Sequence, residues 1–399
     1  MQLMCILIVV SEITSRALSW ISLAVAITLI SSCASSTTPT GGGGAKTGGV
    51  AGVSAGTGSL LVAGTSTKFH PRGFSSIGLL YPAQYASTMC TAMGTTTKNQ
   101  LAAAETTMTT NTQAQLSAMI TYWNANAVRF QVSQGALSYE RENSLSAYTN
   151  MVAAVVNKAR ALNLVTIVSM QTQTYSCTPT RSNGNLQKLP DQLTEEAWAQ
   201  LIPALNIDNG IIFEVFNEPQ TSVECGTQSW TTWATGCGTG DNEGMATVGA
   251  YVRGLAPNNV LLFDADNSGG TFANYTYPSL PGNSAFTIHP YYYTDNSTGW
   301  DTRFGNLQSA GHTVIITEWN ESSNCPYSLD PDQTIADNLV NSYLPAHDTG
   351  LMLFSWDAPG AGVLVNSSTY APVNSNSGCS YFTGATLGLN YFEAQSGGN

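Results

Sequence analysis

Two apolar, β-branched stretches of this chain each end in a glutamate, and this feature constrains the fold more than any other. Residues 210–219 read GIIFEVFNEP and residues 313–320 read TVIITEWN, so Glu218 and Glu318 each follow a short strand. A buried strand carries a charged residue only where its end opens into a site, because an isolated charge is costly to bury. We therefore expect both carboxylates at an edge of a sheet where a site can form.

Strand and helix patterns alternate from Leu60 to Trp356, which predicts an α/β fold. Eight strands are expected, of which the first is a short one near Leu60. Their alternation with helices predicts a (β/α)₈ TIM barrel that forms a single domain over residues 60–399. An open doubly wound sheet is the alternative, and it is disfavoured because no glycine-rich phosphate-binding motif stands between a strand and a helix. The tail after Trp356 shows no clear helix and is expected to form long loops. The later strands are expected at residues 127–132, 164–168, 210–219, 259–264, 285–291, 313–320 and 351–356.

The first 59 residues lack the pattern of a folded domain. Residues 1–33 contain an apolar run after Arg16 and end in Cys33, which is typical of a bacterial lipoprotein signal peptide with Cys33 as the lipidated residue. An ordinary signal peptide cut elsewhere is the alternative. Residues 34–59 are rich in Ser, Thr and Gly and predict a flexible linker. We expect a secreted protein, or a cell-surface or outer-membrane lipoprotein that meets a membrane only through its anchor.

Composition limits the partners of this chain. The formal net charge is −12, which argues against nucleic acid and anionic membranes, because both require a basic patch. Charged residues make up 10% of the chain, and the many hydroxyl and amide side chains suit a neutral, hydroxyl-rich ligand. We expect a monomer.

The cysteines indicate disulfides rather than a metal site. Beyond Cys5 and Cys33 the cysteines are even in number, which is typical of disulfides in a secreted chain, and we expect Cys225 to pair with Cys237 across one loop. Neither a Cys-x-x-Cys nor a His-x-x-x-His spacing occurs. We therefore expect no metal and no cofactor.

Polar residues gather where the expected strands end, and TIM barrels place their active sites there. Strand alternation predicts that Glu214 points away from Val215 and Asn217, and we expect it to be structural. The candidate site residues, in chain order, are Arg129, Gln171, Asn217, Glu218, His289, Tyr291, Glu318 and Trp356.

These residues resemble glycoside hydrolase family 5, the cellulase-type retaining β-glycosidases of clan A. The resemblance covers about residues 65–360 and rests on the motif FEVFNEP at residues 213–219, the pair His289-x-Tyr291, Ile316-Thr317-Glu318, Arg129 and Trp356, in that relation to the strands. It implies a role for each residue: Glu218 as acid/base, Glu318 as nucleophile, Asn217 on the sugar 2-hydroxyl, Arg129 and Tyr291 holding the nucleophile, His289 near the acid/base, and Trp356 as the platform under the sugar.

The chemistry of a retaining glycosidase agrees with these roles. Glu318 must be ionised to attack, and the Arg129 cation and the Tyr291 hydroxyl favour the charged form. Glu218 must carry a proton, which the negative charge of Glu318 favours until that charge is lost in the ester. A retaining mechanism predicts carboxyl groups about 5–5.5 Å apart.

One residue departs from the family pattern. The family usually has a histidine where this chain has Gln171, and an amide could replace its hydrogen bond to a sugar hydroxyl but not its charge.

We therefore expect a retaining endo-β-glycosidase that acts on a β-linked polysaccharide, with β-1,4-glucan as the first expectation and mannan, xyloglucan or another β-glucan as alternatives. A non-catalytic carbohydrate-binding barrel and a structural surface lipoprotein are alternatives of other classes. The binding barrel would be expected to lack one of the two glutamates, and the structural lipoprotein gives no reason for either.

Overall fold

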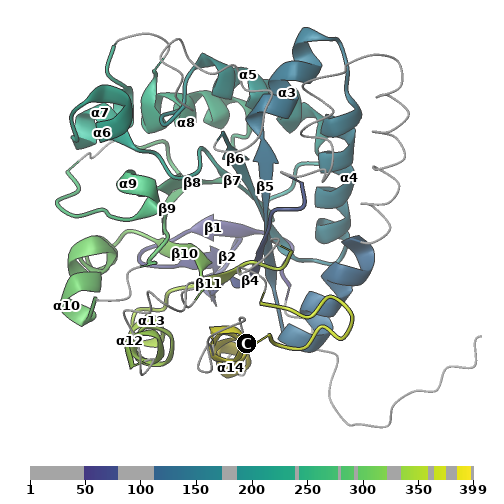
Figure 1. The fold of residues 1–399 in the computed structure, drawn as a ribbon, viewed down its shortest axis with the longest axis vertical. Coiled ribbons are helices and arrows are strands. Elements are labelled where there is room, and N and C mark those ends of the chain that lie inside the picture. The colour runs from purple at the N-terminus through teal and green to yellow at the C-terminus, as the bar shows by residue number, and fades with distance from the viewer. Residues whose placement is uncertain are drawn as a thin grey trace, which may run out of the picture. The chain divides into compact units, whose positions relative to one another are not determined.

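Eight parallel strands close into a barrel in the computed structural model, which describes residues 49–79, 112–172, 187–238, 242–276, 280–291, 295–320, 334–357, 364–373 and 384–396 (Figure 1). Contacts group these residues into one unit. The order around the barrel is β10-β11-β4-β5-β6-β7-β8-β9, and each neighbouring pair is parallel. The expected TIM barrel is confirmed. Its strands are β4 (Arg72–Ser76), β5 (Ala127–Ser133), β6 (Val165–Gln171), β7 (Ile211–Glu214), β8 (Val260–Asp264), β9 (Ser284–Ile288), β10 (Val314–Trp319) and β11 (Leu351–Phe354).

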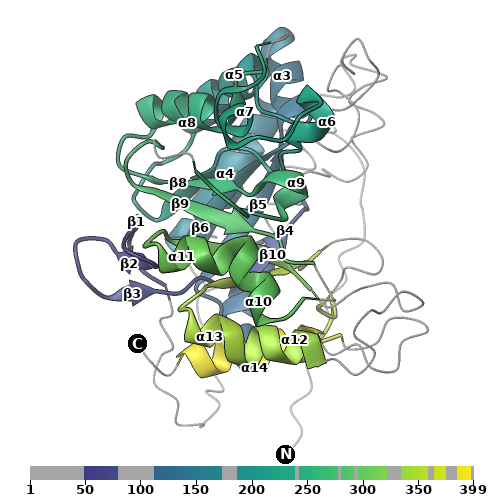
Figure 2. The same ribbon diagram turned by 90° about the vertical axis from the view of Figure 1, so that its left-hand side faces the viewer.

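Helices alternate with these strands and surround the barrel. In both views α5 and α8 lie on the opposite side of the strands from α12 and α14 (Figures 1 and 2). None of the helices among the described residues is long and apolar enough to cross a membrane. The longer helices span residues 112–123, α3 (Gln134–Glu142), α4 (Ala147–Ala161), α5 (Gln192–Leu201), α8 (Gly244–Leu255) and α14 (Gly384–Ser396). The shorter ones are η1 (Ile202–Ala204), α6 (Thr221–Cys225), α7 (Trp230–Thr235), α9 (Asp266–Gly269), α10 (Ser297–Trp300), η2 (Asp301–Gly305), α11 (Asn306–Ser309), α12 (Thr334–Asn338), η4 (Leu339–Tyr343) and α13 (Leu344–Ala346).

The interior of the barrel is a packed apolar core, because successive residues of a strand point to opposite faces. Residues such as Ile167, Ile212 and Met352 point inward and form one buried cluster. Their neighbours, such as Val168 and Phe213, belong to a second cluster with the helices. The barrel wall therefore buries apolar side chains on both of its faces, one toward the interior and one toward the helices.

A small antiparallel sheet covers the N-terminal ends of the barrel strands. It consists of β1 (Val53–Ala55), β2 (Leu60–Val62) and β3 (Lys68–Phe69). The Val53 N–H donates to the Asn209 carbonyl at 2.8 Å, just before β7 begins. Val53, Leu60 and Phe69 join the apolar cluster inside the barrel. This sheet therefore closes the end of the barrel that lies away from the C-terminal strand ends.

This sheet corrects two expectations about the start of the domain. Residues 34–59 do not form a linker to their end, because β1 lies within that range. The strand near Leu60 belongs to the small sheet, and β4 is the first barrel strand. The Gly and Ser content of the segment hid the apolar side chains of Val50 and Val53, which pack on the barrel interior. The expected signal peptide and Cys33 lie outside the described residues.

The chain after Trp356 also differs from expectation, because α14 forms where loops were expected. Gly384 and Gly388 weaken its helical pattern in the sequence. Gly388 packs closely on β11, since a Cβ there would lie 2.4 Å from Leu353 Cδ1 and would force that side chain to move. The ring of Phe392 lies 6.0 Å from that of Phe74 on β4. Tertiary packing on the barrel wall, which no local pattern reports, therefore stabilises this helix.

Val53 tests the corrected domain boundary. We expect Val53→Ala to lower the free energy of unfolding by about 1.5–2.5 kcal/mol, because it removes two buried methyl groups and leaves a cavity. Thermal and denaturant unfolding followed by circular dichroism would measure this. The control is Thr57→Ala, an exposed position in the same segment, for which we expect a change within about 0.5 kcal/mol. Equal stability of the two variants would mean that β1 does not belong to the folded core.

Candidate active site

The C-terminal ends of the barrel strands bring most of the sequence-predicted residues together. Arg129 lies on β5 and Glu318 on β10. Asn217 and Glu218 follow the end of β7, and His289 follows β9 directly. Tyr291 also reaches this group, because its hydroxyl lies 3.2 Å from Glu318 Oε2. Six of the candidates therefore share one site, at the end of the barrel where the sequence placed it.

Arg129 is fully buried and joins the charged residues of the site. Its Nε donates to Glu214 Oε2 at 2.7 Å, and its Nη1 donates to Glu318 Oε1 at 2.6 Å. Its Nη2 donates to Asn217 Oδ1 at 2.6 Å. Burial would lower the pKa of Arg129, but the charges of Glu214 and Glu318 outweigh it and raise that pKa. The guanidinium stays charged, and it also donates to the hydroxyls of Ser75 and Ser169.

Glu214 belongs to this network, which corrects the expectation that it points away from Asn217. Both side chains accept hydrogen bonds from Arg129. Alternation fails here because β7 ends at Glu214 and the chain turns before Asn217. Burial would raise the pKa of Glu214, but Arg129 outweighs burial and lowers that pKa. Glu214 is a buried carboxylate that balances the charge of Arg129.

Glu318 is held by three donors, two from β5 and one from the chain after β9. Besides Arg129 Nη1, the amide of Gln131 donates to Oε1 at 2.5 Å. The Tyr291 hydroxyl donates to Oε2 at 3.2 Å. Gln131 was not among the sequence candidates, although it follows Arg129 by two positions on β5 and so faces the same side of the strand. That spacing is the signal that could have identified it.

Glu218 stands on a turn that Asp264 holds in place. Its backbone is left-handed, with φ of 52°, and its N–H donates to Asp264 Oδ2 at 2.8 Å. Asp264 ends β8 and is fully buried. Burial, and after it the charge of Glu214, raises the pKa of Asp264 well above its ordinary value. Nothing in the sequence around Asp264 separates it from other strand-end carboxylates, so the sequence did not identify it.

His289 lies next to Glu218, as the resemblance implies, and its Nδ1 is also 4.0 Å from Glu318 Oε2. Its Nδ1 lies 3.1 Å from Glu218 Oε1, and its Nε2 lies 2.9 Å from Thr317 Oγ1. Burial would lower the pKa of His289, but the charges of Glu318 and Asp264 and the hydrogen bond to Glu218 outweigh it and raise the pKa to about 9. The imidazole is therefore a cation at neutral pH.

The two catalytic candidates are close enough to act on one bond. One carboxylate oxygen of Glu218, one of Glu318 and a ring nitrogen of His289 all lie within 4.8 Å of one another. Such a triad, like that of Glu214, Asp264 and His289, could be near enough to ligate a metal. A metal there would have to displace the proton of His289, because an imidazolium offers no lone pair. The donor set fits proton transfer better than metal binding.

Trp356 belongs to the apolar cluster between the barrel wall and the helices, which corrects its expected place under the sugar. Its ring makes a T-shaped contact with Phe74, with ring centroids 4.9 Å apart, and stacks on Tyr370 at 5.9 Å. Phe74 belongs to the cluster outside the barrel wall. By alternation along β11, Phe354 takes the inward position beyond Met352. The expectation took Trp356 as the strand end, whereas β11 ends at Phe354.

A cavity of about 650 Å³ adjoins Trp356, and its lining includes Asp357, Gln115 and Tyr370.

Gln171, where the resemblance leads one to expect histidine, is buried at the end of β6. It lies two residues beyond Ser169, which contacts Arg129, so the two side chains share a face of β6.

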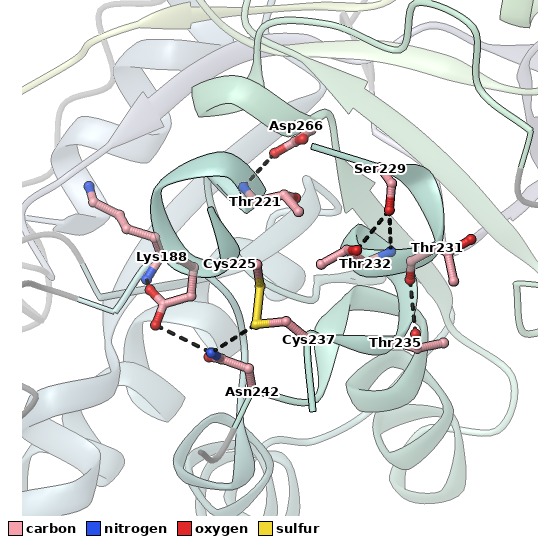
Figure 3. The surroundings of a disulfide bond; sticks show 11 residues. Lys188, Thr221, Cys225, Ser229, Thr231, Thr232, Thr235, Cys237, Asn242 and Asp266 are labelled. Carbon is pink, nitrogen blue, oxygen red and sulfur yellow. Dashed lines mark hydrogen bonds between the residues drawn. A yellow bond between two sulfur atoms is a disulfide. The ribbon is translucent and has the colours of Figure 1, made fainter. Parts of the chain in front are cut away.

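The disulfide between Cys225 and Cys237 is confirmed, with Cα atoms 5.7 Å apart (Figure 3). It ties the end of α6 to the chain after α7, within the loop that follows Glu218. The Thr221 N–H at the start of α6 donates to Asp266 Oδ1 at 2.9 Å (Figure 3). The loop beside the acid/base candidate is thus fixed at both ends. The remaining cysteines, Cys90, Cys177, Cys325 and Cys379, lie outside the described residues.

Comparison with known families agrees with this geometry. The model of the family described as Cellulase (glycosyl hydrolase family 5) matches residues 90–360, which is more than half of the chain. No curated protein sequence matches the chain.

Solved structures resemble the fold over most of its length. A β-glucanase from Saccharophagus degradans in complex with cellotetraose has a TM-score of 0.63 and 13% identity, over 90% of this chain and 98% of that one. The catalytic domain of endoglucanase Cel5A from Thermobifida fusca has a TM-score of 0.55 and 16% identity, over 86% of this chain and 97% of that one. At such identities the likeness shows the fold alone.

The charge on His289 predicts a pH dependence of stability. Because its pKa is raised from 6.5 to about 9, its contribution is fully present below pH 6.5 and is lost as the pH rises through about 9. We expect the free energy of unfolding to fall by about 3 kcal/mol more in the wild type than in His289→Gln across this window. Denaturant unfolding at several pH values measures this, with exposed His312→Gln as the control. Parallel curves for wild type and His289→Gln would contradict the assignment.

Proposed function

Because the chain belongs to glycosyl hydrolase family 5 and is a glycoside hydrolase, we propose that it cleaves β-1,4-glucan within the chain and with retention. The observation that carries this proposal is the pair Glu218 and Glu318, whose nearest oxygens lie within 4.8 Å. That spacing suits the roughly 5–5.5 Å between the carboxyl groups of retaining enzymes and not the roughly 6.5–9.5 Å of inverting ones. The cellotetraose complex and the endoglucanase among the similar folds support a glucan as substrate.

Each residue then has a chemical task. Glu318 attacks the anomeric carbon while Glu218 gives its proton to the leaving oxygen, and a glycosyl ester forms. Glu218 then takes a proton from water, which attacks the same carbon and releases Glu318. Arg129 and Tyr291 orient Glu318 by hydrogen bonds. Asn217 is oriented by Arg129 Nη2, which leaves its amide nitrogen to meet the sugar 2-hydroxyl.

Substitution of the two glutamates tests this function. We expect the wild type to hydrolyse a soluble β-1,4-glucan in a panel that also holds mannan, xyloglucan and mixed-linkage glucan. Glu218→Gln and Glu318→Gln should each lose about 10²-fold or more, because the first loses the proton donor and the second the nucleophile. Glu393→Gln, an exposed position on α14, is the control and should keep full activity. Reducing-sugar release measures the rates.

The same panel separates the alternatives. Proton NMR identifies the anomer that is released first. The β-anomer would establish retention, whereas the α-anomer would overturn it. Azide added to Glu318→Ala should yield the α-glycosyl azide, and azide added to Glu218→Ala the β-azide, because the anion enters the space of the lost carboxylate. Hydrolysis of mannan alone would correct the substrate. Binding of a polymer without hydrolysis of any would leave a carbohydrate-binding barrel.

We also propose that residues 1–33 are a lipoprotein signal and that Cys33 carries the anchor, at a cell surface or outer membrane. The sequence that supports this is the apolar run that ends at Cys33 and the Gly- and Ser-rich segment after it. A lipid on Cys33 would hold the enzyme beside the cell, and soluble sugars would be released there.

The anchor is tested by fractionation after expression in a bacterial host. We expect the wild type in the membrane fraction, with an acylated N-terminus by mass spectrometry. Cys33→Ser should abolish acylation, since it removes the thiol that receives the lipid, whereas Cys5→Ser should not. A wild-type protein found free in the medium without an acyl group would overturn the proposal.

A further inference from the structure

We propose that Gln131 is a further residue of the reaction: with Arg129 it holds Oε1 of Glu318, so that Oε2 is the attacking oxygen. It further stabilises the carboxylate as the sugar leaves it. The assignment rests on the proposed function, because it requires Glu318 to be the nucleophile.

The two oxygens of Glu318 have different surroundings. Oε1 accepts from Arg129 Nη1 at 2.6 Å and from the Gln131 amide at 2.5 Å. Oε2 accepts from the Tyr291 hydroxyl at 3.2 Å and lies 4.0 Å from His289 Nδ1, on the side of Glu218. Two close donors occupy Oε1, whereas Oε2 lies toward the acid/base. When Oε2 attacks, the hydrogen bonds of Arg129 and Gln131 to Oε1 therefore stay in place.

The position of Gln131 makes this contact rigid. The residue is 3% exposed and lies on β5, in register with Ser169 of β6. Arg129, two residues before it, is fixed by Glu214. Both donors to Oε1 therefore come from one strand in the centre of the barrel wall. A buried amide that donates to a carboxylate makes a charge-assisted hydrogen bond, which is stronger than a neutral one.

The role of the hydrogen bond from Gln131 to Glu318 becomes clear when the electrons are followed through both steps of the reaction. In the first step a lone pair of Oε2 forms the bond to the anomeric carbon, and the electrons of the broken glycosidic bond go to the leaving oxygen, which Glu218 protonates. Oε1 becomes the ester carbonyl. In the second step water forms the new bond and gives its proton to Glu218. The electrons of the bond to Oε2 return to Glu318, and its negative charge is shared with Oε1. Gln131 therefore helps the second step most, because it binds the charge that reappears.

A larger effect of Gln131 on the second step than on the first predicts a kinetic signature that a packing role would not produce. With 2,4-dinitrophenyl β-cellobioside the leaving group needs no proton, so breakdown of the ester limits kcat. Gln131→Met should lower kcat by about 10- to 100-fold and lower KM with it, because the ester accumulates. The acidic limb of kcat/KM should move up by about one pH unit, since the ionised nucleophile loses a donor.

The experiment compares Gln131→Met with Gln134→Met. Gln134 is also a buried glutamine, and its amide bonds to Gln187 and Thr194 instead of the nucleophile. The control should keep the KM and the acidic limb of the wild type. Mass spectrometry of quenched enzyme should show more glycosyl adduct for Gln131→Met than for the wild type. Gln131→Glu conserves the side-chain volume if methionine prevents folding, and it should move the acidic limb further upward.

Two results would overturn the role of Gln131 and leave the proposed function standing. One is a Gln131→Met enzyme with the kcat and KM of the wild type, and the other is an equal fall of kcat and kcat/KM with an unmoved acidic limb. An inactive wild type on the dinitrophenyl glycoside and on every polymer of the panel would overturn the proposed function, and this assignment with it.

Discussion

The buried ion pairs of Arg129 are the interaction on which the site depends. A guanidinium in the wall of a barrel is tolerable only if its charge is balanced and its donors are used, because an isolated buried charge is very costly. Glu214 and Glu318 balance it, and Asn217, Ser75 and Ser169 accept its remaining hydrogen bonds. Loss of one partner of such a pair typically costs about 3–5 kcal/mol. The same contacts that stabilise the barrel therefore orient Glu318, the proposed nucleophile.

A second charged group lies beside Glu218, the proposed acid/base. His289 lies between Glu218 and Asp264, and its raised pKa makes it a cation near neutral pH. A cation at 3.1 Å from Glu218 Oε1 favours the ionised carboxylate, whereas the charge of Glu318 favours the protonated one. These two influences oppose each other at Glu218. In the proposed mechanism the ester removes the charge of Glu318, the cation then favours ionised Glu218, and the free carboxylate can take the proton of water.

The sequence predicted the barrel and the positions of six site residues, because strand ends in a closed parallel sheet must meet at one edge. It did not predict what depends on tertiary packing or on the exact strand end. Glu214 and Asn217 were expected to point apart, but β7 stops before Asn217 and both side chains contact Arg129. Trp356 was placed under the sugar, although β11 ends at Phe354. The helix α14 and strand β1 are held by contacts with the barrel rather than by their own patterns.

The departure at Gln171 has a consequence for the whole site. The chain has four histidines, and three of them lie elsewhere: His70 lies 3.8 Å from Asp348, His312 packs on Phe286, and His347 stacks on Tyr343. An amide at Gln171 stays neutral at every pH, so His289 is the one imidazole among the described site residues. Gln131 likewise supplies the nucleophile with a donor that does not titrate. Above neutral pH, loss of the His289 proton would therefore remove the cation that favours the ionised form of Glu218.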